Sequence, residues 1–571
     1  PASNLWRREC LKHLRKLVRF CEKNYGRRML GYHPCGQHTG EWFYLRSWEP
    51  RLSGFSPAMN GGFRHWLKKR YETDATLRKA WGNQRVTLDN AAVPSAQQRR
   101  NTTLGLFRDP HAERQLLDFY EYKQLAMEEP LEDMARVIKE ETGGNKIVTF
   151  FYGYFFDMCG IPSGPQISGH FAMQRMLKCP HVDILCSPIS YFDRGSGGCG
   201  PFMTAVDSVS AAGKLWLNED DTRTYLTPSD AGFGRVNIPK ETLWIHDRNY
   251  GNILPRRMAC WYMDLGGTGW LDGQDIWDNI RQLKHHYETS LAAPATFSPE
   301  VAVIVDERSA MALACKSTIM RPQVYLLRKR LYRLGAPIRI HYLDDLIAGK
   351  IPPCKAYIFL NPFMLDKQTR SAIAKATKGK TAVYFYGSGC LGEKLNDKLM
   401  GELIGMQVSR IESPSAQTTY LKDENPLLAG LPGGVFGSKS KLTPLWAIDK
   451  GEDITPLATL PDGHPIVAAR RSDDGLRVYI GTTDAPAAFL RNILKASGIH
   501  LYIDSNDVIN ADKNFLAITA TTAGKKQISL PESKTVRDLH DNAILTTNTT
   551  SLEILMANGE TRLLLLEEDG K

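Results

Sequence analysis

Short apolar strands alternate with amphipathic helices in the first half of the chain, and this alternation restricts the fold more than any other feature. Runs typical of strands fall near residues 28–33, 146–152, 182–186, 214–218 and 257–263. Segments with helical periodicity fall near residues 5–24, 58–80, 112–142, 168–178, 201–212 and 274–290. Strands that alternate with helices indicate parallel βα units. Polar and aromatic residues stand at the predicted strand ends, where a (β/α)8 TIM barrel builds its active site.

The predicted barrel has too few strands before residue 294, since five can be counted and a closed barrel needs eight. With about 30 residues in each βα unit, the run at 28–33 corresponds to strand 4 and the helix at 5–24 to helix 3. We therefore expect strands 1–3, roughly 100 residues, either upstream of Pro1 or on a separate polypeptide. An open five-stranded sheet would leave unpaired strand edges that favour aggregation.

Proline-containing segments at residues 292–294 and 298–299 separate the barrel from a second α/β series. Its strands are predicted near residues 301–305, 338–342, 356–360, 382–386, 465–469 and 477–480, and its helices near 322–334, 367–377 and 485–496. This pattern is typical of a doubly wound, flavodoxin-like domain. From residue 499, short alternating strands such as 515–521 and 551–556 predict a small β-sandwich. The predicted domains are therefore 1–294, 295–498 and 499–571.

The composition argues against several classes of protein. No stretch approaches the roughly 18 consecutive apolar residues of a membrane span. The net charge is +10, but the basic residues are scattered in short runs, so nucleic acid is not an expected partner. The 11 cysteines include no CxxC pair, which favours buried thiols over disulfides or a zinc site. We expect no metal and no other cofactor.

Two glutamates at predicted strand ends are the candidate catalytic residues. Glu41 follows the first predicted strand in the segment HTGEWFY, and Glu219 directly follows the strand at 214–218. If the first strand is barrel strand 4, Glu219 follows strand 7, and these two strand ends face each other across the barrel mouth. Retaining glycosidases need two carboxyl groups ~5 Å apart, one protonated and one ionised.

The neighbours of the two glutamates favour different protonation states. Glu219 is followed by Asp221 and Arg223, and an arginine near a carboxylate keeps it ionised. Glu41 precedes Trp42, in a partly apolar setting that favours the protonated form. The prediction is that Glu41 is the acid/base and Glu219 the nucleophile.

An aromatic-rich pattern follows Glu41, with F-R-x-W-L first, then single Tyr and Leu positions, and finally A-W-G. The matching residues are Phe63, Arg64, Trp66, Leu67, Tyr71, Leu77, Ala80, Trp81 and Gly82. This pattern resembles the loop after the acid/base residue in glycoside hydrolase family 42, which belongs to clan A. The order of domains is also similar, because that family has a barrel, a degenerate glutamine-amidotransferase-like domain and a small β domain. The resemblance covers nearly the whole chain and implies a divergent β-galactosidase-type enzyme that acts with retention.

The chain departs from the family pattern at two points. Clan A enzymes usually have an Asn before the acid/base residue, where it contacts the sugar 2-hydroxyl, and this chain has Gly40. The cysteine zinc cluster of the family is not recognisable. A β-galactoside is the favoured substrate, and a β-mannosidase or β-glucosidase activity is the alternative. The implied partner is an oligosaccharide or glycoside with a terminal β-linked sugar.

Candidate sugar-binding residues lie at the predicted strand ends and beside the two glutamates. They are His33, Gln37, His38, Trp42, Tyr152, Tyr154, Tyr191, Arg194, Asp221, Arg223, Trp261 and Asp264. Aromatic faces suit the apolar C–H face of a pyranose, and carboxylates and amides suit its hydroxyls. By the resemblance, Tyr191 occupies the place of a tyrosine that bonds the nucleophile, and Trp261 that of a tryptophan under the sugar.

The second domain has one candidate nucleophile of its own. Cys390, in the segment GSGC, follows the predicted strand at 382–386, but no HxE pair follows it. We therefore expect a structural domain, and the resemblance implies that it mediates contacts in a homo-oligomer, with a trimer favoured. A non-catalytic carbohydrate-binding or scaffold protein is the alternative from another class, because three βα units are missing from the predicted barrel. We expect a bacterial protein of either the cytoplasm or the periplasm.

Overall fold

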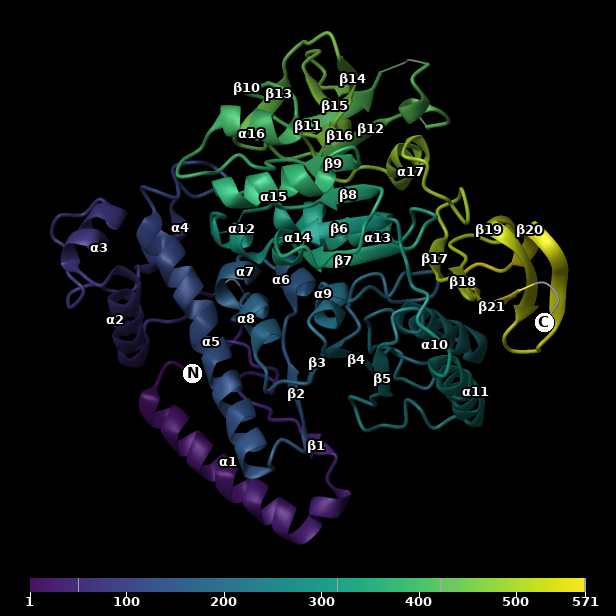
Figure 1. Ribbon diagram of the computed structural model, residues 1–571, viewed down its shortest axis with the longest axis horizontal. Helices are drawn as coiled ribbons and strands as arrows, with labels where there is room; N and C mark the ends of the chain where they lie inside the picture. Colours follow the sequence, from purple (N-terminus) through teal and green to yellow (C-terminus); the bar gives the residue numbers. More distant parts are fainter. Residues whose placement is uncertain (50, 316, 422–423, 432, 569–571) are drawn as a thin grey trace.

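Three larger sheets organise the molecule (Figure 1). The computed structural model describes residues 1–49, 51–315, 317–421, 424–431 and 433–568. In the view of Figure 1, the first sheet lies in the lower centre, the second above it and the third at the right. No described helix is both long and apolar enough to cross a membrane.

The first sheet has five parallel strands in chain order, which confirms the predicted part of a barrel. Strands β1 to β5 comprise Gly31–Tyr32, Ile147–Phe151, Ile184–Pro188, Leu215–Asp220 and Ala259–Tyr262. Strands β1 and β5 are its edges, since neither has a second strand neighbour among the described residues. The expectation that further strands complete the ring stays a prediction. Strand β4 extends beyond the predicted segment, so Glu219 is its penultimate residue and not the first residue of a loop.

The same part of the chain also forms a series of helices. They are α1 (Asn4–Tyr25), α2 (Pro57–Tyr71), α3 (Asp74–Trp81), α4 (Ala96–Arg100), α5 (Arg114–Glu141), α6 (Phe155–Cys159), α7 (Gly164–Ile167), α8 (Met173–Lys178), α9 (Val206–Ala211), α10 (Pro239–Ile253) and α11 (Gln274–Leu291). Helix α1 runs along α5, as Figure 1 shows. Several ion pairs link these helices, among them Arg7–Glu129 at 2.9 Å and Arg15–Glu141 at 2.6 Å.

Helix α10 is absent from the sequence-based prediction because its buried side is polar. Its buried residues include His246, Asp247, Arg248, Asn249 and Asn252, which hide the apolar period that marks an amphipathic helix. These side chains bond to the rest of the fold. Asn249 Nδ2 donates to Asp220 Oδ2 of β4 at 2.8 Å, and the Arg248 guanidinium donates to backbone carbonyls of residues 194–198.

The second sheet has nine strands, of which five are parallel and in flavodoxin-like order. The parallel part runs β7 (Ile338–Tyr342), β6 (Val301–Val305), β8 (Ala356–Phe359), β9 (Thr381–Phe385) and β16 (Gly475–Ile480). Antiparallel strands extend it in the order β15 (Pro465–Ser472), β14 (Ile454–Thr459), β11 (Ala416–Tyr420) and β12 (Val435–Ser438). Strands β10 (Val408–Ile411) and β13 (Leu445–Ile448) pair separately. The sequence predicts the parallel strands, and β15 is the one antiparallel strand that it finds.

Several helices accompany the second sheet. They are α12 (Glu307–Met311), α13 (Arg328–Leu331), α14 (Leu343–Ile347), α15 (Lys367–Thr377), α16 (Asp397–Ile404) and α17 (Ala487–Ala496), together with a π-helical segment at Arg321–Leu326. One cluster of buried apolar residues includes members from Val18 to Val508 and therefore joins the first and second sheets in one core. The predicted boundary near residue 294 does not divide this core.

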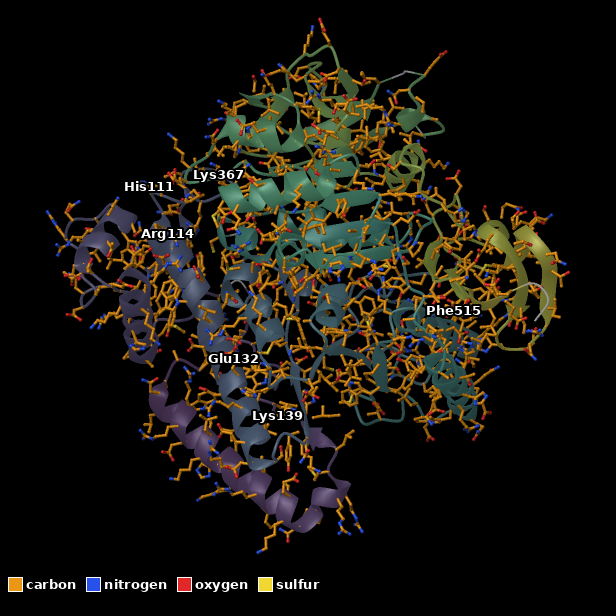
Figure 2. The ribbon with its side chains drawn as sticks, in the orientation of Figure 1. His111, Arg114, Glu132, Lys139, Lys367 and Phe515 are labelled. Carbon is orange, nitrogen blue, oxygen red and sulfur yellow. The ribbon has the colours of Figure 1, made fainter. Side chains whose placement is uncertain are left out.

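The C-terminal region is rich in β-structure, as expected, and its strands lie in one antiparallel sheet. The strands are β17 (Val508–Ala511), β18 (Phe515–Thr519), β19 (Gly524–Asp538), β20 (Ile544–Met556) and β21 (Thr561–Glu567). The sheet packs on α10 through Phe515, labelled in Figure 2, whose ring centroid lies 6.1 Å from that of Tyr250. His540 Nε2 also lies 2.9 Å from Asp247 Oδ2 of the same helix.

Candidate active site

Glu219 lies near the carboxyl end of β4, between two neighbouring strands. It is in register with Pro188 of β3 and Trp261 of β5. Paired residues of neighbouring strands point to the same face of a sheet, so the Trp261 indole flanks the Glu219 carboxylate. Glu219 is 5% exposed and Trp261 is 36% exposed. Within the described residues, no side chain donates a hydrogen bond to the Glu219 carboxylate.

Asp221, two residues after Glu219, is fully buried and paired with two arginines. Arg194 Nη2 lies 2.5 Å from Asp221 Oδ1, and Arg223 Nη1 lies 2.6 Å from Oδ2. The Tyr191 hydroxyl donates to Oδ2 at 3.2 Å. The prediction that Arg223 neutralises Glu219 is wrong, because its guanidinium pairs with Asp221. Tyr191, Arg194, Asp221 and Arg223 thus form one network beside Glu219.

The loop that carries Glu41 has an unusual backbone. Four of its non-glycine residues have φ values near +60°, a conformation that L-amino acids rarely adopt. They are Gln37, Thr39, Trp42 and Arg46, and Gly40 has φ +82°. Such strained residues cost roughly 1–3 kcal/mol each and concentrate at functional sites. The conformation of the loop around Glu41 therefore lowers the free energy of unfolding.

Two hydroxyl groups fix the Glu41 carboxylate. The Tyr154 hydroxyl donates to Oε1 at 2.8 Å, and the Thr39 hydroxyl donates to Oε2 at 2.7 Å. Tyr154 is 3% exposed. Burial and the nearby charge of Glu41 raise the pKa of Tyr154 well above its usual value, so the phenol stays protonated and remains a donor. The predicted sugar-binding residue Tyr154 therefore positions Glu41.

His170 is a functional candidate that the sequence-based prediction misses. Its Nδ1 accepts from the backbone N–H groups of Gly153 and Tyr154, at 3.1 and 3.3 Å. The other nitrogen, Nε2, therefore carries the proton and donates to the Glu41 backbone carbonyl at 3.1 Å. Burial lowers the pKa of His170 to about 3, so the ring is neutral. His170 follows Glu41 by 129 residues, and no local motif links the two.

The two glutamates influence each other electrostatically. Burial raises the pKa of Glu219 to about 8, and the charges of Asp221 and Glu41 add to the rise while Arg194 opposes it. Burial also raises the pKa of the Cys35 thiol, and the charges of both glutamates raise it further. Both carboxylates and this thiol therefore share one region of space. Like charges at close range favour a state in which the pair holds one proton.

Two aromatic residues predicted to bind sugar are instead parts of the core. Trp42 is 1% exposed, and its indole N–H donates to the Pro34 carbonyl at 3.0 Å. Tyr152 has no exposed surface, and its hydroxyl donates to the Gly169 carbonyl at 2.9 Å. Neither ring can contact a substrate, because packing and internal hydrogen bonds occupy it.

Asp264 is bonded within its own loop. Its carboxylate accepts backbone N–H groups of its own loop, from Gly266 at 3.1 Å, Gly269 at 2.7 Å and Trp270 at 3.0 Å. These bonds hold the pKa of Asp264 below its usual value, although burial opposes them. The carboxylate closes a turn after β5.

Three predicted residues remain accessible on the Glu41 loop. His33 is exposed and packs on Phe151, with ring centroids 4.5 Å apart. His38 is partly exposed and packs on Trp48 at 4.7 Å. Gln37 is also partly exposed. All three can reach solvent beside Glu41.

A large cavity among the described residues lies away from the two glutamates. It measures about 2130 Å³ and lies between α3 and α5 on one side and the second sheet on the other. His111, Arg114 and Lys367, which are labelled in Figure 2, all line it. Neither Glu41 nor Glu219 lines it, so the chemistry of the carboxylates and not cavity size identifies the site.

The second sheet offers no comparable site in the described part of the chain. Cys390 has no exposed surface, and burial raises the pKa of its thiol far above the usual value. A thiol in that state is not a nucleophile. No group of three or more His, Cys, Asp or Glu side chains among the described residues could hold a metal ion.

Comparison with known proteins gives structural neighbours only. No family model matches the sequence, and no curated protein matches it. A β-galactosidase from Bacillus circulans sp. alkalophilus superposes with a TM-score of 0.69 at 15% identity, over 99% of this chain and 83% of that chain. A GH42 β-galactosidase from G. stearothermophilus gives 0.65 at 13% identity, over 99% and 82%.

The chain has the fold of the GH42 β-galactosidases. A GH42 exo-carrageenase from Bacteroides ovatus is also similar, with a TM-score of 0.54 at 10% identity over 100% of this chain and 70% of that one. The predicted family 42-like fold is therefore confirmed at the level of structure.

Proposed function

We propose that this protein is a retaining glycoside hydrolase that cleaves a terminal β-linked sugar. The observation that supports this most strongly is a pair of glutamates beside one parallel sheet, Glu219 near the end of β4 and Glu41 on the loop after β1, with the charge of Glu41 adding to the rise in the pKa of Glu219. Two carboxyl groups that share one proton are what double displacement at an anomeric carbon requires. The GH42 fold adds to this support.

In the proposed reaction, the Glu219 carboxylate attacks the anomeric carbon and the Glu41 carboxyl group protonates the departing glycosidic oxygen. The glycosyl–enzyme ester is then hydrolysed by water, which gives its proton back to Glu41. Tyr154 holds one carboxylate oxygen of Glu41, and His170 holds its backbone carbonyl. Both are positioning residues, because neither is placed to touch the substrate.

The protonation states set a condition on this mechanism. The raised pKa of Glu219 means that the free protein keeps a proton on the proposed nucleophile at neutral pH. The proton must therefore pass to Glu41, or leave, before attack. Exchange between the two carboxyl groups satisfies this condition, since together they need one proton in total.

The favoured substrate is a β-galactoside, with a β-mannoside or β-glucoside as the alternative within the same mechanism. The neighbours named β-galactosidases favour galactose. Gly40, which stands where clan A enzymes usually have Asn, leaves the contact to the sugar 2-hydroxyl to another group. A panel of nitrophenyl β-glycosides should give the highest kcat/KM with the galactoside.

Azide rescue tests the mechanism and assigns the roles. The Glu219→Ala variant with azide should form an α-glycosyl azide, because azide attacks the vacant face of the sugar. The Glu41→Ala variant with azide should form the β-glycosyl azide from the glycosyl–enzyme. The opposite pair of products would exchange the two roles. An inverted sugar from the wild-type protein would contradict retention altogether.

A carbohydrate-binding or scaffold protein without activity is the second candidate. The open edges of the first sheet favour it, because a five-stranded sheet supplies only part of a substrate wall. Binding on a glycan array without hydrolysis of any nitrophenyl glycoside would support this candidate over the enzyme.

We also propose that further parallel strands, from a preceding segment or a separate polypeptide, pair with β1 and β5. The unpaired edges support this, as does Leu30 beside β1, which is 79% exposed. Addition of such a segment should slow hydrogen exchange at the backbone amides of both edge strands. A trimer is the proposed assembly, which light scattering can test.

A further inference from the structure

Phe233 has a solvent-exposed aromatic ring and a strained backbone conformation. It lies in the loop between β4 and α10 and is 56% exposed. Its φ is +49°, and its neighbours Gly232 and Gly234 have φ values of +63° and +74°. An aromatic residue in this conformation is a genuine outlier, and strain of this kind persists where the surroundings enforce it. Packing within the chain does not account for the exposed ring.

The loop is firmly anchored at its base. Arg235 Nε donates to the Thr227 carbonyl at 2.6 Å, and its Nη2 donates to the Tyr225 carbonyl at 3.1 Å. The Val236 N–H donates to the Arg223 carbonyl at 3.3 Å, and the Val236 side chain is buried. The ring is therefore held in place and is not on a loose segment.

A second anchor joins this loop to the one that carries Tyr191 and Arg194. A Cβ atom on Gly234 would lie 2.7 Å from the Gly195 nitrogen, so the two backbones are in direct contact. Only a glycine allows this approach at position 234. The Phe233 ring is thus fixed relative to the network around Asp221.

The contacts of Phe233 place it next to the proposed catalytic centre. Its centroid lies 5.0 Å from that of Tyr191, and Arg223 Cζ lies 5.0 Å from its ring centre. Tyr191 and Arg223 both bond to the Asp221 carboxylate, two residues after Glu219. The guanidinium covers one side of the ring, which leaves aromatic surface on the other side for a ligand. Tyr191 and Arg223 therefore connect Phe233 to Asp221, which is close to Glu219 in the chain.

We propose that Phe233 is the stacking platform for the sugar on the leaving-group side of the cleaved bond. This inference rests on the proposed glycosidase function. The C–H face of a β-linked pyranose would lie on the exposed face of the ring, as aromatic side chains in sugar sites require. The sugar that is cleaved off lies nearer Glu219, where Trp261 already supplies an aromatic wall.

The test compares two substrates that differ on the leaving-group side. β-Galactosyl fluoride has no leaving-group sugar, whereas a β-linked galactobiose has one. In the Phe233→Ala variant, the ratio of kcat/KM for galactobiose to kcat/KM for the fluoride should fall about tenfold, mainly through KM. Phe233→Tyr and Phe233→Trp should restore the ratio, because both keep a flat ring. If the glycoside panel selects another sugar, the matching fluoride and disaccharide replace these two.

Phe20→Ala is the matched control, since Phe20 is 57% exposed on α1. An equal fall with both substrates, or the same change in Phe20→Ala, would overturn the inference. So would an unaltered ratio together with a changed molar mass in light scattering, because Phe233 would then be a subunit contact. If the wild-type protein cleaves neither substrate, the proposed function fails instead.

Discussion

The two parallel sheets of this chain have similar sequence patterns. The polar groups at their carboxyl ends differ in how fully they are hydrogen-bonded. In the second sheet, the Asp306 carboxylate caps α12 by accepting the N–H groups of Arg308 and Ser309, both at 3.1 Å. Asn361 exchanges two hydrogen bonds with the Asp306 backbone, at 2.9 and 2.7 Å. Both of these side chains have partners within the chain.

At the first sheet, the corresponding groups are left partly unsatisfied. The Glu219 carboxylate receives no hydrogen bond from any described residue and lies near the charge of Asp221. The Glu41 loop holds strained residues on both sides of the catalytic candidate. The difference teaches that strand topology alone does not make a site. Asp306 and Asn361 have partners within the chain, whereas the carboxylate of the proposed nucleophile Glu219 has none among the described residues.

Substitution of Glu219 should give the largest difference in kcat between variants of the two sheets. Glu219→Gln should lower kcat by a factor on the order of 10⁴ or more, because it removes a covalent nucleophile. Cys390→Ala, at the end of the second sheet, should keep kcat within about twofold, since a small buried apolar residue is replaced by another. Turnover of a nitrophenyl β-galactoside measures both. A comparable loss in the Cys390 variant would place chemistry in the second sheet as well.

Two tyrosines, one at each sheet, should give the next largest difference in kcat. Tyr154→Phe removes the hydrogen bond to Glu41 Oε1 and should lower kcat roughly ten- to a hundredfold, with little change in KM. Tyr342→Phe removes a buried hydrogen bond to Thr204, at 2.9 Å, beside the second sheet and should leave kcat nearly constant. Each should cost about 1 kcal/mol of stability. Equal kcat in the two variants would mean that Tyr154 has a structural role only.

The pH dependence of kcat/KM tests the raised pKa of Glu219 at the first sheet. Because the two carboxyl groups need one proton in total, kcat/KM should fall as pH rises through about 8, where that proton is lost. Asp221→Asn should move this midpoint down by about one unit, because it removes a nearby negative charge and leaves Arg194 and Arg223 unneutralised. A midpoint that does not move, or a kcat/KM that stays constant through pH 8, would contradict the shared proton.

The smallest expected effect is on stability. The pKa of Glu219 is raised above its unfolded value, so its favourable contribution is present below the unfolded pKa of 4.5 and is lost as pH rises to about 8. Glu219→Gln does not titrate and should raise Tm by about 2 °C at pH 9 but not at pH 4.

Glu307 is the matched control, because burial also raises its pKa to about 8. Its carboxylate accepts the N–H groups of Met173 and Gln174, at 2.9 and 3.1 Å. Glu307→Gln should show a similar gain in Tm between pH 4 and pH 9, but from a lower Tm at both pH values, because the amide nitrogen cannot accept from a backbone N–H group. Equal Tm changes of the two variants at pH 4 would show that hydrogen bonding does not distinguish them.

The strands of both parallel sheets are predictable because each is a short apolar run flanked by helices. Helix α10 is not, since its buried side is polar and its partners lie far away in the sequence. Glu41 and Glu219 stand out because each follows or ends a strand. Their roles cannot be read from neighbours in the sequence, because Arg223 turns towards Asp221.

The aromatic candidates show a second limit. Tyr152 and Tyr154 are two residues apart near the end of β2, yet one bonds to the Gly169 carbonyl and the other to Glu41. The sequence pattern is the same for both, and only tertiary packing separates them. His170 is found only in three dimensions, because its contacts to the Glu41 loop depend on how that loop folds back.

The shared core has a consequence for how this chain can change over evolutionary time. Since buried residues from Val18 to Val508 form one cluster, the two sheets do not have separate free energies of unfolding. A shortened gene that lacks the second sheet would expose the outer wall of the first, and its product would lose the catalytic strands as well. Because the second sheet belongs to the same core, mutations within it are expected to lower the amount of folded protein in the cell.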